Sequence, residues 1–229
     1  MDLDRRAELA ANLADVRARI ATAAIAAGRD PQDVQLIAVT KTWPLSDIQL
    51  LADLGLRDFG ESRDQEASIK ASDWRELDGR DVVWHFIGQL QTNKAKSVAS
   101  YASVVHTVDR PSLVTALRKS DRPLDCLLQL SVDGDIARGG ARRGDLLELA
   151  ADLTDPLRLR GIMAVAPLGM DPAAAFAEVR AAHADLLAAH PQATIRCIGM
   201  SDDLEAAVAA GATHVRVGSA LLGKRPPAH

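Results

Sequence analysis

Short apolar runs alternate with segments of helical character along almost the whole chain, and this alternation constrains the fold more than any other feature. Each run has the length of a strand that is buried on both faces. The expected strands cover residues 35–40, 57–60, 82–87, 103–108, 125–131, 158–164, 194–199 and 213–217. The expected helices cover residues 45–54, 62–71, 91–100, 111–119, 142–153, 172–189, 202–210 and, briefly, 219–223.

Eight strand–helix units in succession predict an α/β fold, a closed (β/α)8 barrel of the TIM type. A doubly wound open sheet is the main alternative, although it seldom contains so many regular units. The length of 229 residues suits one such barrel, and no low-complexity linker divides the chain. We therefore expect one domain over residues 1–229, with the barrel over about 34–223.

An additional amphipathic helix is expected before the barrel, over about residues 4–27. An apolar stripe runs along it from Leu9 to Ile20, and Gly28 ends it. We expect this helix to pack against the amino-terminal end or the side of the barrel. The last residues, 224–229, are expected to form a short tail.

Composition and charge argue against several functional classes. The net charge of −4 and the lack of basic clusters interleaved with aromatics give no reason to expect a nucleic-acid partner. The amino terminus lacks the apolar core of a signal peptide, and no segment reaches transmembrane length, so we expect a cytoplasmic protein. Cys126 and Cys197 are expected to be reduced core residues, and no residue set has the spacing of a closed metal site.

A lysine stands at the end of the first expected strand. Ile37, Val39 and Lys41 share one face of that strand, and Pro44 ends the extended segment. Desolvation at such a position favours the neutral amine, which is the form that attacks an aldehyde. The alternative is a lysine that reaches from the strand end into water.

The ends of the last two expected strands carry groups suited to phosphate, which often binds at this place in (β/α)8 barrels. The amides of Gly218, Ser219 and Ala220 open a short helix, and Ser201 can donate from the neighbouring loop. Taken singly, Ser201 can equally be a helix N-cap and Gly218 a plain turn. Together with Lys41 they predict a ligand that carries both an aldehyde and a phosphate. Pyridoxal 5′-phosphate (PLP) is a common ligand of that kind.

Arg216 shares the strand face of Gly218, which lies two residues further on. A guanidinium in this place needs an acceptor or a carboxylate. Near the pyridine nitrogen of PLP it would keep that nitrogen unprotonated, and the ring would be a weaker electron sink. A structural salt bridge is the alternative role for Arg216.

Eight short motifs lie in order over residues 34–223. They are Ala38-Val39-Thr40-Lys41-Thr42, Asp58-Phe59-Gly60-Glu61, Trp84-His85-Phe86-Ile87-Gly88, Leu90-Gln91-Thr92-Asn93-Lys94, Val108-Asp109, Leu159-Arg160-Gly161-Ile162-Met163, Gly199-Met200-Ser201-Asp202-Asp203 and Val215-Arg216-Val217-Gly218-Ser219. With these motifs the chain resembles the pyridoxal-phosphate homeostasis proteins, which are single-domain relatives of the alanine racemase barrel. The resemblance implies that fold and a Schiff base of PLP on Lys41. It also implies Ser201, Gly218 and Ser219 around the phosphate. Arg216 would lie near the pyridine nitrogen.

Four positions depart from the pattern of the family that the chain resembles. Ser62 stands where asparagine is general, and Ser219 replaces a common threonine. Trp43 stands where a small or basic residue is frequent and is a candidate to cover the cofactor. Arg138 replaces a common lysine on the loop after the fifth strand and keeps its charge.

Three further motif residues have open roles. His85 is expected to be a hydrogen-bonded barrel residue rather than a general base. Asn93 either shapes the rim of the barrel or starts the helix after the third strand. Glu61 either orients a residue at the rim or is a solvated carboxylate.

The resemblance implies a protein that stores or delivers PLP inside the cell, in vitamin B6 homeostasis, without robust catalysis of its own. The main alternative is an amino-acid racemase, which needs acid–base groups on both faces of the bound substrate. In alanine racemases the second group is a tyrosine from a partner's extra domain. Here the chain ends after the barrel, and its only tyrosine, Tyr101, is expected near the opposite rim. A third alternative is a sugar-phosphate aldolase barrel, which also uses a lysine Schiff base. Its lysine usually lies on a later strand, and the motifs would remain unexplained.

The same expectation extends to partners. Apo PLP-dependent enzymes are the expected recipients of the cofactor, and neither nucleic acid nor a membrane is expected to bind. A monomer is favoured over an obligate dimer, because the racemase's usual reason to dimerise is absent.

Overall fold

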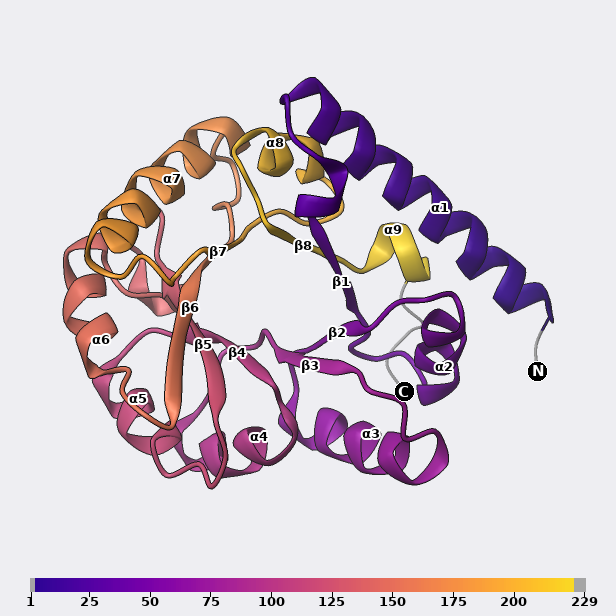
Figure 1. Ribbon diagram of the computed structural model, residues 1–229, viewed down its shortest axis with the longest axis horizontal. Helices are drawn as coiled ribbons and strands as arrows, with labels where there is room; N and C mark the ends of the chain where they lie inside the picture. The colour runs from indigo at the N-terminus through magenta and orange to yellow at the C-terminus, as the bar shows by residue number, and fades with distance from the viewer. Residues whose placement is uncertain (1–2, 225–229) are drawn as a thin grey trace.

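The computed structural model of the protein describes residues 3–224, and within that range eight parallel strands pair in chain order until β8 closes on β1 (Figure 1). The strands are β1 (Gln35–Val39), β2 (Asp58–Glu61), β3 (Val83–Phe86), β4 (Val104–Val108), β5 (Leu124–Leu130), β6 (Leu157–Ala164), β7 (Ile195–Cys197) and β8 (His214–Val217). The predicted closed barrel is confirmed, and the open sheet is wrong. Every strand begins and ends within two residues of its expected bounds.

Helices surround the strands on the outside of the barrel (Figure 1). The α-helices are α1 (Leu3–Ala26), α2 (Leu45–Asp53), α3 (Asp64–Leu77), α4 (Ala95–Tyr101), α5 (Pro111–Leu117), α6 (Leu146–Asp152), α7 (Pro172–Ala189), α8 (Leu204–Ala209) and α9 (Ser219–Leu222). Short 3-10 turns are η1 (Pro31–Asp33), η2 (Thr92–Lys94), η3 (Ile136–Arg138) and η4 (Arg143–Asp145). The expected tail lies outside the described residues, apart from Lys224.

The extra helix α1 packs on the side of the barrel, next to α8 and α9 (Figure 1). Leu9, Leu13 and Ile20 are buried on its apolar stripe. Polar side chains of α1 also satisfy carbonyls at the end of α9, because Asn12 donates to Leu221 O and Arg5 donates to Leu222 O, each at 3.0 Å. Both ends of the described chain therefore meet beside β8 and β1.

Alternate residues of the strands face the barrel interior and the helical layer. On β1, Leu36 and Ala38 belong to the large core between strands and helices. Ile37 belongs instead to a smaller cluster inside the barrel, with Val104, Leu127, Met163 and Cys197. Val39, the last residue of β1, lies two residues after Ile37 on the same face, and Lys41 follows the end of this strand.

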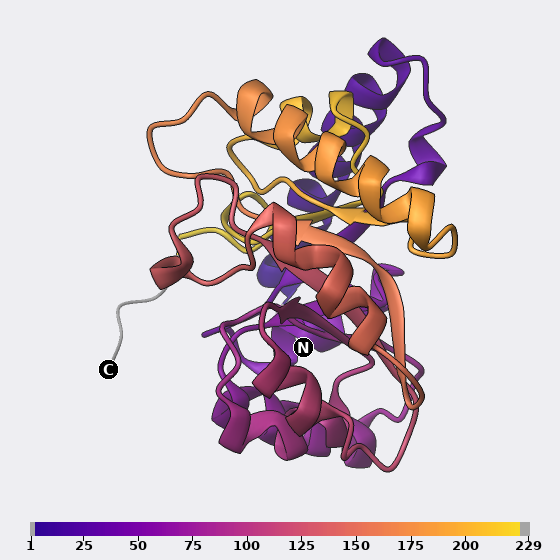
Figure 2. The same cartoon turned by 90° about the vertical axis from the view of Figure 1, so that its left-hand side faces the viewer.

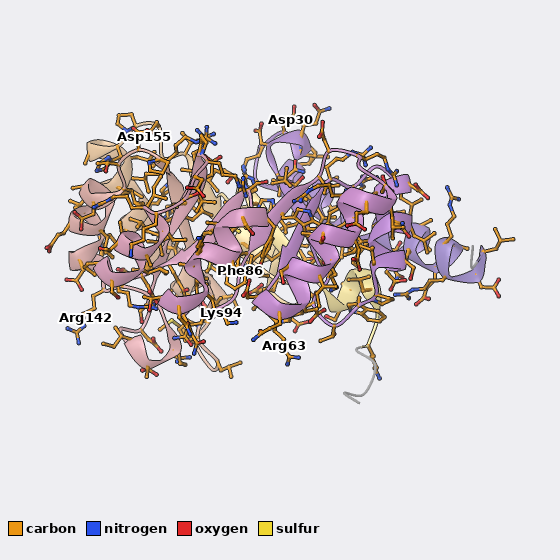
Figure 3. The ribbon with its side chains drawn as sticks, turned by 90° about the horizontal axis from the view of Figure 1, so that it is seen from below. Asp30, Arg63, Phe86, Lys94, Arg142 and Asp155 are labelled. Atoms are coloured by element: carbon orange, nitrogen blue, oxygen red, sulfur yellow. The ribbon has the colours of Figure 1, made fainter. Side chains whose placement is uncertain are left out.

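The carboxyl ends of the strands meet at one end of the barrel, which we call the mouth. In the side view of Figure 2, the β5–α6 connection and the β6–α7 loop project on the left from this end. Figure 3 shows Arg63, Lys94 and Arg142, which follow strands, on the side of the molecule opposite Asp30 and Asp155, which precede strands. Among residues 3–224, no helix is long and apolar enough to cross a membrane.

Candidate functional site

Lys41 lies in a turn immediately after β1, at the mouth. The strand ends at Val39, although Thr40 N still donates to Gly60 O of β2 at 3.0 Å. Thr42, the residue after Lys41, has a φ of 70°, so the backbone turns sharply at this point. Lys41 itself is half-buried. The extended segment is thus shorter than the apolar run suggested, because the turn begins at the lysine itself.

Two serines from neighbouring loops meet at the mouth. Ser219 Oγ, at the start of α9, donates to Ser201 Oγ over 3.2 Å, and Ala220 N donates to the same oxygen over 3.4 Å. We call the group of Ser201, Gly218, Ser219 and Ala220 the serine cup. The cap position of α8 is Asp203, so Ser201 is not the N-cap of that helix. The hydroxyl of Ser201 is instead directed across to α9.

Gly218 brings the serine cup next to the first strand. A Cβ atom built on Gly218 would stand 3.4 Å from the Cβ of Val39 and 3.5 Å from its carbonyl oxygen. Val39 precedes Lys41 by two residues. The serine cup and the lysine are therefore neighbours at the mouth, on the adjacent strands β8 and β1.

Arg216 is buried inside the barrel and is held by carbonyl groups. Its guanidinium donates to Cys197 O at 2.7 Å and to Ala164 O at 2.9 Å, and it lies 3.1 Å from Cys197 Sγ. Within residues 3–224 these bonds reach no carboxylate, so the alternative of a structural salt bridge is wrong. Arg216 keeps an unneutralised charge in the barrel, two residues before the serine cup.

A chain of buried polar groups crosses the barrel interior. His85 Nε2 lies 2.9 Å from Asp58 Oδ1, and His85 Nδ1 lies 2.8 Å from His106 Nε2. Gln35 also donates to Asp58, over 2.5 Å. Burial, with the charges of His85, Arg216 and His214, lowers the pKa of His106 well below its usual value. His85 is thus a hydrogen-bonded barrel residue, as expected.

Sequence reasoning missed Asp58 and His106 as members of this chain, although strand alternation carries the signal. On β4, Val104 belongs to the inner cluster, so His106 two residues later faces inward as well. Asp58 likewise precedes Gly60 by two residues, and a Cβ on Gly60 would meet the inward Ile37 at 3.1 Å.

Glu61, at the end of β2, is fully buried, with 1% of its surface exposed, so the reading as a solvated carboxylate is wrong. It accepts hydrogen bonds from Thr40 Oγ1 at 2.7 Å and from Lys70 Nζ at 2.8 Å. Burial raises the pKa of Glu61, and the ammonium of Lys70 opposes that rise.

Other motif residues lie away from the serine cup. Trp43 was a candidate to cover the ligand, but its ring packs against the outer core and under the guanidinium of Arg5, 4.8 Å from the ring centroid. Asn93 lies in the 3-10 turn η2 that leads into α4. Arg138 pairs with Asp133 and Asp135 within its own loop. Ser62 is half-buried, and its backbone packs closely against Gly88.

Tyr101 ends α4, and its side chain belongs to the buried core. Burial raises the pKa of Tyr101, and the carboxylates of Asp64 and Glu61 raise it further. Glu61 ends β2 and Asp64 begins α3, so both lie at the carboxyl end of that strand. The Tyr101 hydroxyl comes near them because a helical side chain points back toward the amino end of its helix. The backbone of Tyr101 is thus at the far rim, as expected, while its hydroxyl lies buried in the helical layer.

Comparisons with known proteins agree with one another. A family model described as the alanine racemase N-terminal domain matches residues 7–226. A pyridoxal phosphate homeostasis protein of Mycobacterium leprae is 41% identical over 96% of this chain and 94% of its own. A protein of the same name from Escherichia coli is 39% identical over 95% of this chain and 97% of its own. The solved structure of PipY from Synechococcus elongatus, with PLP bound, is 33% identical, with a TM-score of 0.78 over 94% of this chain and 100% of PipY.

Proposed function

The chain belongs to the alanine racemase N-terminal domain family and, within it, to the pyridoxal phosphate homeostasis proteins, and from that premise we propose that it binds PLP at the barrel mouth. The observation that carries the proposal is the serine cup, which abuts Val39 through Gly218 only two residues before Lys41. The serine cup and Lys41 are therefore close enough to bind the phosphate and the aldehyde of one small ligand.

The residues at the mouth fit the chemistry of PLP. Ser219 Oγ and the backbone amide of Ala220 both donate to Ser201 Oγ. The two hydroxyls can rotate toward a phosphate, and the amide is a third donor at the same place. Gly218 leaves open the space that a side chain would fill beside Val39. Arg216 is the donor that we assign to the pyridine nitrogen, because the buried guanidinium meets no carboxylate among the described residues.

Lys41 supplies the covalent link in this proposal. Its neutral amine nitrogen bonds to the aldehyde carbon of PLP, and the carbonyl oxygen leaves as water with the two hydrogens of the amine. The product is a Schiff base, which hydrolysis reverses, so that the cofactor can be loaded and released. PLP bound in this way absorbs visible light and becomes permanently attached on reduction.

The proposed role is storage or delivery of PLP rather than catalysis. A racemase needs a second acid–base group across the substrate from the lysine. The only tyrosine of the sequence, Tyr101, is buried in the helical layer. His85 and His106 are hydrogen-bonded to each other inside the barrel. A guanidinium at the pyridine nitrogen also makes the ring a weak electron sink. We therefore propose that any turnover at this site is weak.

The binding proposal is tested by borohydride reduction of the purified protein with PLP, followed by peptide mass analysis. We expect the adduct on Lys41, its loss in Lys41→Ala, and its retention in Lys94→Ala, a second lysine of the mouth. An adduct retained in Lys41→Ala would refute the assignment. A turnover with single-enantiomer amino acids of roughly 1 per second or more would favour the racemase instead.

We propose further that the protein acts in the cytoplasm, as a monomer, and passes PLP to apo-enzymes at its mouth. Exposed apolar side chains on the two projecting loops support such contacts, since Leu168 is 98% and Ile136 is 56% exposed. Leu168→Asp should slow transfer of PLP to an apo-enzyme while the affinity for PLP stays unchanged. Equal transfer rates in the wild type and in Leu168→Asp would contradict this docking role. The proposed monomeric state is tested separately by light scattering.

A further inference from the structure

A second lysine lies buried next to the turn that carries Lys41 and is bound to the carbonyl of Thr40. Lys70, on α3, is only 7% exposed, and its ammonium donates to three acceptors. These are Glu61 Oε1 at 2.8 Å, Glu66 Oε1 at 2.6 Å and the backbone oxygen of Thr40 at 2.8 Å. An ammonium has three hydrogens to donate, so the three contacts use all of them.

This ion cluster of Lys70, Glu61 and Glu66 holds the residues on both sides of Lys41. Thr40 is tied twice, since its carbonyl accepts from Lys70 and its hydroxyl donates to Glu61 over 2.7 Å. Thr42 is tied through its backbone N–H, which donates to Glu66 Oε1 over 2.5 Å. The cluster therefore forms hydrogen bonds to Thr40, immediately before Lys41, and to Thr42, immediately after it.

The backbone at this point needs such support. Thr42 has a φ of 70°, in the left-handed region, and it is the only residue other than glycine with a positive φ in the described chain. A β-branched residue is an outlier there and keeps that conformation only where surrounding contacts hold it. Two contacts do so at this turn: the bond from Thr42 N to Glu66, and the bond from Trp43 N to Thr40 O at 3.0 Å.

The cluster has the character of a positioning device. Buried ion pairs add little net stability over apolar residues of similar size, because desolvation offsets the attraction. Their best-attested use is to specify one arrangement out of several. Here the arrangement that the contacts specify is the turn that carries Lys41.

We propose that Lys70, with Glu61 and Glu66, is a positioning residue that holds Lys41 where its amine meets the aldehyde of PLP. The proposal rests on the proposed function and assigns a role to groups that do not touch the ligand. Lys70 is not itself the nucleophile, since its buried nitrogen is already bound to Glu61, Glu66 and the carbonyl of Thr40. A small displacement of a reacting group costs roughly 10- to 100-fold in rate, so a loosened turn should slow the covalent step.

The test separates the covalent step from phosphate binding. Two ligands are compared: PLP, which has the aldehyde, and pyridoxine 5′-phosphate, which carries an alcohol in its place. Stopped-flow absorbance gives the rate of Schiff base formation with PLP. Calorimetry gives the affinity for pyridoxine 5′-phosphate, which reports on the noncovalent contacts of the phosphate and the ring without the Schiff base.

Glu66→Ala is the primary variant, because the Glu66 side chain is 25% exposed and we expect the fold to tolerate its loss. We expect Schiff base formation to slow about tenfold or more, while pyridoxine 5′-phosphate binds within about twofold of the wild type. Lys70→Met should slow the reaction at least as much, and Lys70→Arg should restore part of the rate. Glu76→Ala, an exposed site on the same helix, should change neither ligand.

The outcomes decide the proposal one way or the other. An unchanged rate of Schiff base formation in Glu66→Ala overturns it, as does an equal loss for both ligands, which would mark a merely structural role. If the wild type itself forms no adduct on Lys41, the proposed function fails first, and that failure is visible before any variant is made. Thermal unfolding of each variant shows that the comparison is made on folded protein.

Discussion

Gly218 at the end of β8 lies against Val39 at the end of β1, and a Cβ on the glycine would stand 3.4 Å from the Cβ of the valine. This contact joins the last strand to the first, between the serine cup and the turn that carries Lys41. Gly218 has a φ of −114°, which any residue adopts, so its backbone does not require glycine, and an alanine would fit beside Val39 while a larger side chain would not.

Enlarging Gly218 should therefore block PLP without unfolding the barrel. Gly218→Leu is expected to reduce the affinity for PLP by at least about tenfold, because the side chain fills the space between the serine cup and Lys41. Gly218→Ala makes only an ordinary van der Waals contact with Val39 and serves as the control. Absorbance titration and thermal unfolding measure the two effects, and full affinity in Gly218→Leu would place the phosphate elsewhere.

Removing the two hydroxyls of the serine cup should weaken PLP binding. A hydrogen bond to a charged group contributes about 1.5–3 kcal/mol, so Ser201→Ala with Ser219→Ala should lower affinity by roughly 100-fold or more. The unfolding temperature should stay near that of the wild type, because the two side chains lie at the surface of the mouth. Ser100→Ala, an exposed serine on α4, is the matched control. Unchanged affinity in the double variant would mean that backbone amides alone hold the phosphate.

Arg19 should influence the ligand without touching it. From α1 it donates to the carbonyl of Ser201 at 2.8 Å and forms an ion pair with Glu205 at 2.6 Å. Arg19→Met frees the loop that carries Ser201, and we expect PLP to bind several-fold more weakly. Arg17→Met, two residues earlier on the exposed side of the helix, should bind as the wild type does. Calorimetry would contradict the idea if both variants bound alike.

Acid should destabilise the fold between about pH 6.5 and pH 4. Burial, with the charge of His85, lowers the pKa of His214 to about 4, and burial lowers that of His106 as well. The unfolded chain protonates these histidines near their ordinary pKa of about 6.5, so below that pH the unfolded state binds more protons. The free energy of unfolding therefore decreases as the pH is lowered, by up to about 1.4 kcal/mol per pH unit for each group.

Urea unfolding at about pH 7.5 and about pH 5 checks this expectation. The denaturation midpoint should fall at the lower pH, and His214→Asn should make the fall smaller. His190→Asn, at the end of α7, is the control and should leave the pH dependence unchanged. Equal midpoints at the two pH values would show that the buried histidines do not titrate on unfolding.

The architecture was predictable because periodicity survives in the sequence. Eight apolar runs with helical segments between them leave few alternatives, and their bounds agree closely with the strands observed. The pairing of Ser201 with Ser219 followed from one rule, that loops after the last two strands of a barrel are neighbours. The sequence could not reveal that Ser201 faces α9 instead of capping α8, since the cap position falls two residues later, at Asp203.

The rest of the site depends on tertiary contacts that no local pattern records. The ring of Trp43 packs under the guanidinium of Arg5, which comes from a helix far away in the sequence. The ion cluster next to the Lys41 turn also depends on a tertiary contact, because it joins Glu61 on β2 to Lys70 on α3. An amphipathic reading of α3 places Lys70 on the buried side with Ala67 and Trp74, but a lone lysine there looks like an error in the pattern.

The contacts of α1 bear on the order in which the chain can mature. α1 is the first of the described helices to leave the ribosome and α9 the last, yet Arg5, Asn12 and Arg19 of α1 hold the carbonyls of Leu222, Leu221 and Ser201. A nascent chain that has already made Lys41 still lacks the serine cup. On the proposed binding mode, a chain that ends before α9 would lack the groups that hold the phosphate, so PLP would be captured only after α9 is translated.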